Sequence, residues 1–203
     1  MTTLFFPTLS VLTPDQMSFS LESNTMVFTA PLNRSVQTTE MPGARWHAKM
    51  SWAAPPNTDG RLIKAFLAQL RGRAGRFYLY DFTHPTPYGS AQGTPQVHGA
   101  AQSGNSIVTW GWTPNQAQLL LPGDYLGIGS QLVLVTASAS SDGSGGATVT
   151  FEPPLRSSPL DNTAITINKP TCTMMLADDT QDAMTYTGPL SVNISIECFE
   201  VFV

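Results

Sequence analysis

Residues 44–82 constrain the fold of this chain more than any other stretch, because they combine two strand patterns with a helix pattern. Large apolar residues such as Trp46 and Trp52 alternate with polar residues such as His47 and Lys49. This alternation predicts a strand with one buried and one wet face. A second, aromatic-rich strand is predicted over 77–82. The rest of the chain is expected to pack around this unit.

A helix is predicted between these two strands, over about residues 57–71. Pro55 and Pro56 end the first strand, and Asn57 is placed to cap the first turn through its side chain. Gly72 stands where a glycine commonly ends a helix. Apolar residues at helical spacing predict that one helix face covers a sheet; they are Leu62, Ile63, Phe66, Leu67 and Leu70.

Composition favours a mainly β protein. The 203 residues include 16 Gly and 16 Pro, and only 12% are charged, which suits many turns and few solvated helices. The formal net charge of −4 argues against nucleic-acid specificity. No apolar run reaches the length of a membrane span, and the first residues do not resemble a signal peptide. We therefore expect a soluble protein made in a cytoplasm, with no membrane insertion.

The middle of the chain predicts an inserted unit. Residues 83–104 are rich in Gly, Pro, Ser and Gln, and four short strand patterns follow at 107–112, 125–128, 132–136 and 147–151. We interpret residues 92–157 as a small all-β module, either a barrel or a sandwich. The core domain is then 1–91 plus 158–203, predicted to be an antiparallel β-sandwich flanked by the one helix.

The C-terminal residues 191–203 predict a long apolar strand. Ile194, Ile196 and Cys198 keep one phase of the alternation, whereas Phe199 and Val201 take the other. A β-bulge near Cys198 would reconcile the two phases. So apolar a strand is expected either at the centre of a sheet or at a subunit interface.

No pattern in the sequence predicts an enzyme, a cofactor site or a metal site. A metal site could be drawn from Asp81, His84 and His98, but unrelated surface histidines are the favoured interpretation. No GxSxG motif is present. The chain is therefore predicted to be non-catalytic and to need no cofactor. Binding of carbohydrate remains an alternative, which an exposed Trp110 or Trp112 in a shallow groove would favour.

Charge is distributed unevenly along the chain. Arg71, Arg73 and Arg76 belong to a basic stretch, and Asp178 and Asp179 to an acidic one. The planar donor groups of arginine suit pairing with carboxylates, so these five residues are candidates for an interface between subunits arranged head to tail. The alternative is that the arginines complement an ordinary helix C-terminus.

The two cysteines, Cys172 and Cys198, are too few for a disulfide framework or a zinc cluster. We expect two buried, reduced thiols. A disulfide between paired strands is the alternative.

Several of these segments together resemble structural proteins of tailed bacteriophages. The resemblance lies in RWHAK at 45–49, AFLAQLRGRAGRF at 65–77, PGDYLGI at 122–128, PPLR at 153–156 and the apolar terminal strand with Glu197. It covers most of the chain from Ala44 onward and is closest to the distal tail and baseplate proteins of long-tailed phages. These segments are sequence patterns at the level of a family and are not motifs with a known chemical mechanism.

The resemblance implies a tail-tube-like β-sandwich that assembles as a homo-oligomeric ring, sixfold in that family. Such a ring would be part of the virion, between the tail tube and the tail-tip or baseplate hub proteins. The inserted module departs from the simplest tube subunit. Positions in the tube itself or in a head–tail adaptor therefore remain alternatives.

Overall fold

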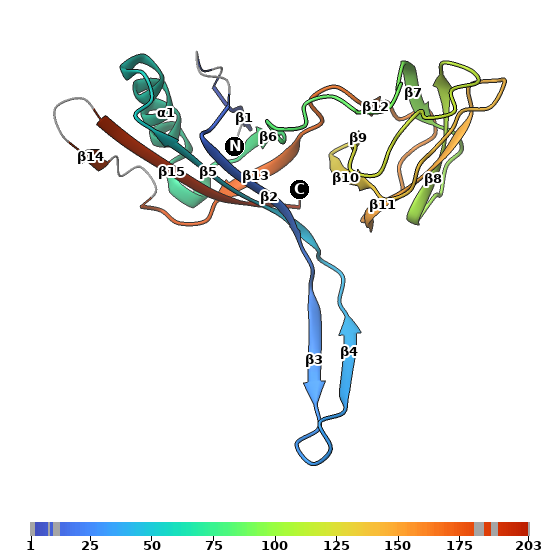
Figure 1. The fold of residues 1–203 in the computed structure, drawn as a ribbon, viewed down its shortest axis with the longest axis horizontal. Coiled ribbons are helices and arrows are strands. Elements are labelled where there is room, and N and C mark those ends of the chain that lie inside the picture. The colour runs from blue at the N-terminus through green and yellow to red at the C-terminus, as the bar shows by residue number, and fades with distance from the viewer. Residues whose placement is uncertain (1–2, 8, 10–12, 181–184, 188–190, 203) are drawn as a thin grey trace.

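The computed structural model describes residues 3–7, 9, 13–180, 185–187 and 191–202. The prediction of a mainly β protein with one α-helix is confirmed over this range. Figure 1 shows three parts: a large sheet with the helix, a smaller curved sheet, and a two-stranded ribbon that projects away from both. The relation to a sandwich and to the tail-tube fold stays a prediction.

The large sheet, called the core sheet here, places the C-terminal strand at its centre. Within the described residues it runs β1 (Leu4–Phe5), β6 (Phe77–Leu79), β13 (Cys172–Leu176), β15 (Ser191–Glu200), β5 (Arg45–Ala53) and β2 (Gln16–Glu22), with β14 (Thr185–Thr187) also paired to β15. Only β1 and β6 are parallel among these pairs. The expected central position of the terminal strand is confirmed.

The bulge predicted near Cys198 is wrong. The β15–β5 register is unbroken from Asn193 to Phe199, with Cys198 opposite Ala48 and Phe199 opposite His47. Phe199 keeps the regular phase and lies on the polar face, where its ring stacks on His47 with centroids 4.5 Å apart. The strand therefore needs no bulge, because the apolar side chain of Phe199 has an aromatic partner on the wet face.

The alternation of β5 was predicted correctly. Trp46, Ala48, Met50 and Trp52 are buried, and their side of the core sheet is covered by α1 (Asn57–Leu70). Ile63, Phe66, Leu67 and Leu70 pack into the same cluster. The opposite face is wet, with Ser18, Lys49 and Ser195 exposed. The core therefore lies between one sheet face and one helix.

The helix differs from its prediction at two points. Pro56, not Asn57, occupies the N-cap position, and it makes no side-chain cap hydrogen bond. Leu62 is exposed, because it lies at the edge of the apolar stripe. The end of the helix is close to the expected one: Arg71 adopts φ 53° at the C-cap, Gly72 follows with φ 65°, and a 3₁₀ turn, η1 (Gly72–Ala74), leads to β6.

The smaller sheet is a nearly closed barrel. Its order is β12 (Ile165–Thr166), β9 (Tyr125–Ile128), β10 (Gln131–Val135), β11 (Ala147–Leu155), β8 (Gly104–Trp112) and β7 (Gly93–Val97). The two end strands meet through a bridge between Gln96 and Ala164, and the Val97 amide donates to the Thr163 carbonyl at 2.9 Å. The barrel has its own apolar cluster.

The barrel extends past the module boundary predicted at residue 157. Its strand β12 comes later in the chain, where Ile165 pairs with Ile128 and is buried in the barrel cluster. Residues near 165 were expected to belong to the core domain. The difference arises because a two-residue strand carries too little pattern to indicate which sheet it joins.

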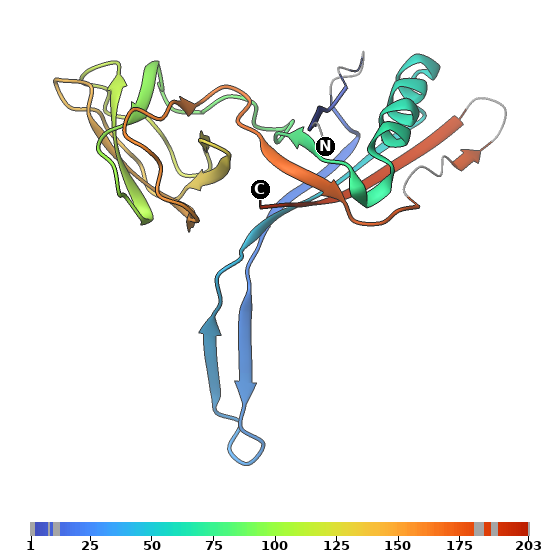
Figure 2. The ribbon, with the colours of Figure 1, turned by 180° about the vertical axis from the view of Figure 1, so that it is seen from behind.

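The projecting ribbon consists of β3 (Thr25–Thr29) and β4 (Val36–Glu40), which pair only with each other among the described strands. It continues β2 and β5 beyond the edge of the core sheet, as Figure 2 shows from behind. Every residue of both strands is exposed.

Candidate functional surfaces

The predicted interface residues lie close together within one chain. The Asp179 Oδ1 atom accepts the backbone N–H of Arg73 at 2.7 Å, so the acidic and basic stretches already meet inside the subunit. The Arg76 Nη1 atom donates to the carbonyls of Arg73 at 2.8 Å and Gly75 at 2.8 Å, which braces the turn after the helix. The Asp179 contact is with the Arg73 backbone amide and not with a guanidinium group, so pairing of the arginines with carboxylates across subunits stays a prediction.

The histidines are not brought to one place. The His84 Nδ1 atom lies 3.0 Å from Asp81 Oδ2, and Asp81 also accepts the amide and hydroxyl of Thr83. His98 lies instead on the barrel, with its ring 5.7 Å from that of Trp110. Over the part of the chain that the structure describes, no cluster of three or more His, Cys, Asp or Glu side chains could hold a metal ion.

Cys172 and Cys198 are free thiols with no exposed surface. Burial raises the pKa of both thiols, and for Cys172 the Glu200 carboxylate adds to the rise. Because the thiolate is the reactive form, we expect neither cysteine to react with a thiol reagent at about pH 8 until the chain unfolds. Ellman's reagent with and without denaturant measures this. Rapid reaction of the native protein would contradict it.

The core sheet and the barrel are joined by a buried contact that the sequence did not reveal. The Trp46 Nε1 atom of β5 donates to the Leu132 carbonyl of β10 at 2.9 Å, and the Trp46 ring packs edge-on against Tyr125 of β9. Burial, followed by the carboxylate of Asp81, raises the pKa of the Tyr125 hydroxyl, which stays neutral. Leu132 belongs to the apolar cluster of the core sheet, not to that of the barrel.

An ion pair forms a second connection between the two parts. Arg156, which follows β11, donates to both carboxylate oxygens of Glu200 in β15, at 2.7 and 2.6 Å. The Glu200 side chain is 2% exposed and that of Arg156 is 24% exposed. Glu200 Oε2 also accepts the Trp46 amide at 3.1 Å. The barrel is therefore fixed to the core sheet at two points.

The ribbon presents an apolar surface. Phe28 is 65% exposed and Leu32, at the tip, is 99% exposed. Further large apolar side chains are exposed along its length, Met26, Val27 and Val36, and Met41 is exposed directly after β4. The tip is ordered by its own bonds, because Asn33 Oδ1 accepts the Ser35 amide at 3.1 Å and the Ser35 hydroxyl at 2.9 Å.

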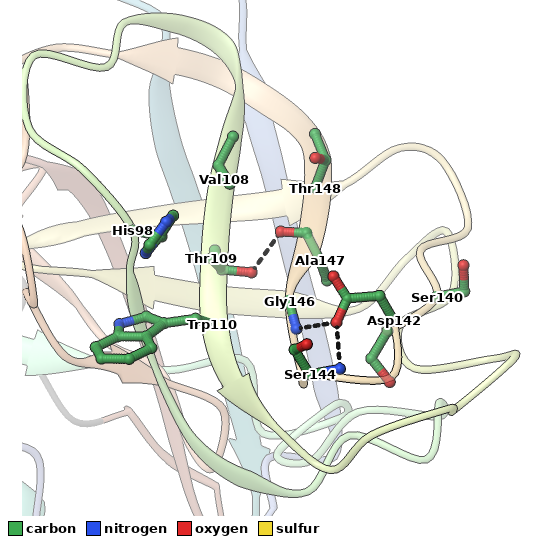
Figure 3. A pocket seen from close by; sticks show the side chains of 11 residues that line it. His98, Val108, Thr109, Trp110, Ser140, Asp142, Ser144, Gly146, Ala147 and Thr148 are labelled. Carbon is green, nitrogen blue, oxygen red and sulfur yellow. Dashed lines mark hydrogen bonds between the residues drawn. The ribbon is translucent and has the colours of Figure 1, made fainter.

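A recess of about 470 Å³ opens on the outer face of the barrel, over β8 and β11. Trp110 and Asp142 lie on its opposite sides, as Figure 3 shows. Trp110 is 44% exposed. Trp112, the other tryptophan considered from the sequence, is buried and donates through Nε1 to Thr109 Oγ1 at 2.7 Å.

No protein-family model matches this chain, and no curated protein is significantly similar to it. The single described helix has 14 residues, and no described helix is long and apolar enough to cross a bilayer.

Proposed function

We propose that this chain is a structural subunit of a bacteriophage tail, in a distal tail or baseplate ring that connects the tail tube to the tail tip. The segments that resemble tail proteins suggest this setting. The observation that carries the proposal is the projecting ribbon, whose exposed apolar side chains need a protein partner. Under this proposal the core sheet with its helix is the tail-tube-like part, and the barrel is an addition to it.

Each face of the ribbon carries two large apolar side chains. Residues directly opposite each other on paired strands share a face. Val27 and Val36 therefore belong to one face, since Val27 is opposite Thr38 and Thr29 is opposite Val36. Met26 and Phe28 belong to the other face. The apolar side chains of both faces would be buried most completely if the ribbon lay between two protein surfaces.

A neighbouring copy of the chain is the partner that we propose. An arm that leaves one subunit and lies on a different patch of the next makes a heterologous contact, and such contacts close into a ring when the rotation permits. A two-stranded ribbon is marginally stable alone, so burial of its side chains would also stabilise the arm. Arg71 and Arg73 remain candidates for contacts with acidic groups of the neighbour.

The ribbon can be tested without disturbing the core. We expect Met26→Thr/Phe28→Thr and, separately, Val27→Thr/Val36→Thr to weaken self-association about tenfold or more, since each pair removes one apolar face. Threonine keeps a high strand propensity, so monomer stability should change little. Sedimentation velocity over a range of concentrations measures the association.

Leu160→Thr is the matched control, because Leu160 is 77% exposed and lies outside the ribbon. It should associate like the unmodified chain. If both ribbon variants also associate like the unmodified chain, the ribbon is not the assembly arm. If only one of the two ribbon variants weakens association, only one face of the ribbon is covered by a partner, and the ribbon does not lie between two surfaces.

A further inference from the structure

We propose that the recess on the barrel binds an uncharged oligosaccharide, stacked on Trp110 and hydrogen-bonded to Asp142. This site is separate from the ribbon and does not depend on the proposed assembly. Its volume of about 470 Å³ is within the usual range of ligand pockets.

The aromatic side of the recess is built on a braced stretch of backbone. Trp110 points outward from β8, and His98 lies beside it at the end of β7. Gln102 holds this side in place, because its Nε2 donates to the His98 carbonyl at 2.9 Å and its Oε1 accepts the Val108 amide at 2.7 Å. A large exposed indole offers an apolar surface to the C–H face of a sugar ring.

The polar side of the recess is equally fixed. Asp142 Oδ1 accepts the amides of Ser144 at 2.7 Å and Gly146 at 2.8 Å, which leaves Oδ2 outside these two bonds. The same two amides hold the pKa of Asp142 below its ordinary value. The neighbouring Ser141 hydroxyl donates to the Thr113 carbonyl at 2.7 Å and anchors the loop to the barrel. Sugar hydroxyls are donors that suit such a preset carboxylate.

Gly146 makes the space between the two sides. It precedes Ala147, which pairs with Thr109, so Gly146 lies next to Trp110 across the β8–β11 pair. A Cβ atom at position 146 would come within 2.7 Å of Asp142 Oδ2. The missing side chain therefore leaves both the floor of the recess and this carboxylate oxygen accessible.

The charges of the lining residues favour uncharged ligands over anionic ones. Among the described residues that line the recess, Asp142 is the only carboxylate and none is Lys or Arg. An anionic ligand would meet this carboxylate with no Lys or Arg side chain to offset it. The remaining polar groups include the His98 imidazole and several hydroxyls, such as those of Ser140, Ser144 and Thr148. Trp110 and Asp142 lie on opposite sides of β8, so a ligand that touches both must reach across this strand.

Calorimetric titration of the full chain tests the site, with cellobiose, maltose, lactose and diacetylchitobiose as probes and sialyllactose as an anionic comparator. A glycan array then extends the search to longer neutral chains. We expect binding of at least one neutral probe and weaker binding of the anionic one. Trp110→Ala should weaken that binding about tenfold, and Trp110→Phe less. Asp142→Asn, which keeps an Oδ1 acceptor for the two amides, should also weaken it.

Tyr88→Ala is the matched control, since Tyr88 is an exposed aromatic residue outside the recess. It should bind like the unmodified chain. Absence of binding to every neutral glycan overturns the proposal, as does unchanged binding by Trp110→Ala. If Trp110→Ala abolishes self-association instead, the recess is a contact between copies and the glycan assignment fails, while assembly itself stands.

Discussion

Replacing Arg156 by methionine is expected to lower the free energy of unfolding by about 3 kcal/mol, near the lower end of the range for breaking a buried ion pair. The Glu200 carboxylate is almost fully buried, and each of its two oxygens accepts a hydrogen bond from the Arg156 guanidinium group. Without that partner the carboxylate keeps the Trp46 amide but lies uncompensated in the joint between barrel and core sheet. Urea unfolding followed by circular dichroism measures the loss.

The chain contains a matched control for this variant. Arg45 pairs with Glu22 at 2.8 Å, but their side chains are 39% and 50% exposed. Arg45→Met should therefore cost less than about 1 kcal/mol. Glu200→Gln in the Arg156→Met background should recover part of the loss, because it removes the buried charge. Equal effects of Arg156→Met and Arg45→Met would contradict the role assigned to this pair.

Trp46→Ala is expected to cost about 4 kcal/mol, in the usual range for truncating a fully buried large aromatic residue. The indole is buried between β5 and the barrel, stacks on Phe19 with centroids 5.2 Å apart and donates to the Leu132 carbonyl. Trp46→Phe should cost about 1–3 kcal/mol, because it keeps an aromatic ring but leaves a carbonyl unpaired. Thermal and urea unfolding report both values.

Trp110→Ala is the control for this second prediction. It removes the same side chain from an exposed strand position, so stability should change by no more than about 0.5–1 kcal/mol. Comparable losses for Trp46→Ala and Trp110→Ala would show that the joint is not a principal source of stability. A small effect at Trp110 also makes that variant a clean test of binding by the recess.

The sequence predicted the elements whose pattern is local and long. The alternation through Trp46 and Trp52 identified β5 and its buried face, and helical spacing identified α1. The apolar phase of Ile194 and Ile196 identified a central strand. In each case several buried residues recur at a regular spacing, so the periodicity can be recognised in the sequence.

The features that were missed depend on contacts between distant residues. The Arg156–Glu200 pair joins residues 44 positions apart, and the Trp46–Leu132 bond joins residues 86 positions apart. The ribbon of β3 and β4 pairs apart from the core sheet, which was not predicted, because pattern alone does not reveal which neighbours a strand has.

The candidate sites were likewise predicted only in part from the sequence. Trp110 was considered for carbohydrate binding because of its residue type, while its exposure and the Asp142 turn became visible only in the folded barrel. The arginines were recognised as a charged group, but the Asp179–Arg73 contact within one subunit was not foreseen. Residue type indicates candidate chemistry, whereas accessibility is a property of the tertiary structure.

Self-assembly through the ribbon is tested most directly by the copy number of the native protein. Native mass spectrometry of the purified full chain, with electron microscopy of the same sample, gives the mass and the shape together. We expect a single closed ring with a central hole and six copies of the chain. A strict monomer at concentrations up to about 1 mM, where even weak interfaces are occupied, would contradict the account. Open filaments of variable length would contradict the closed ring.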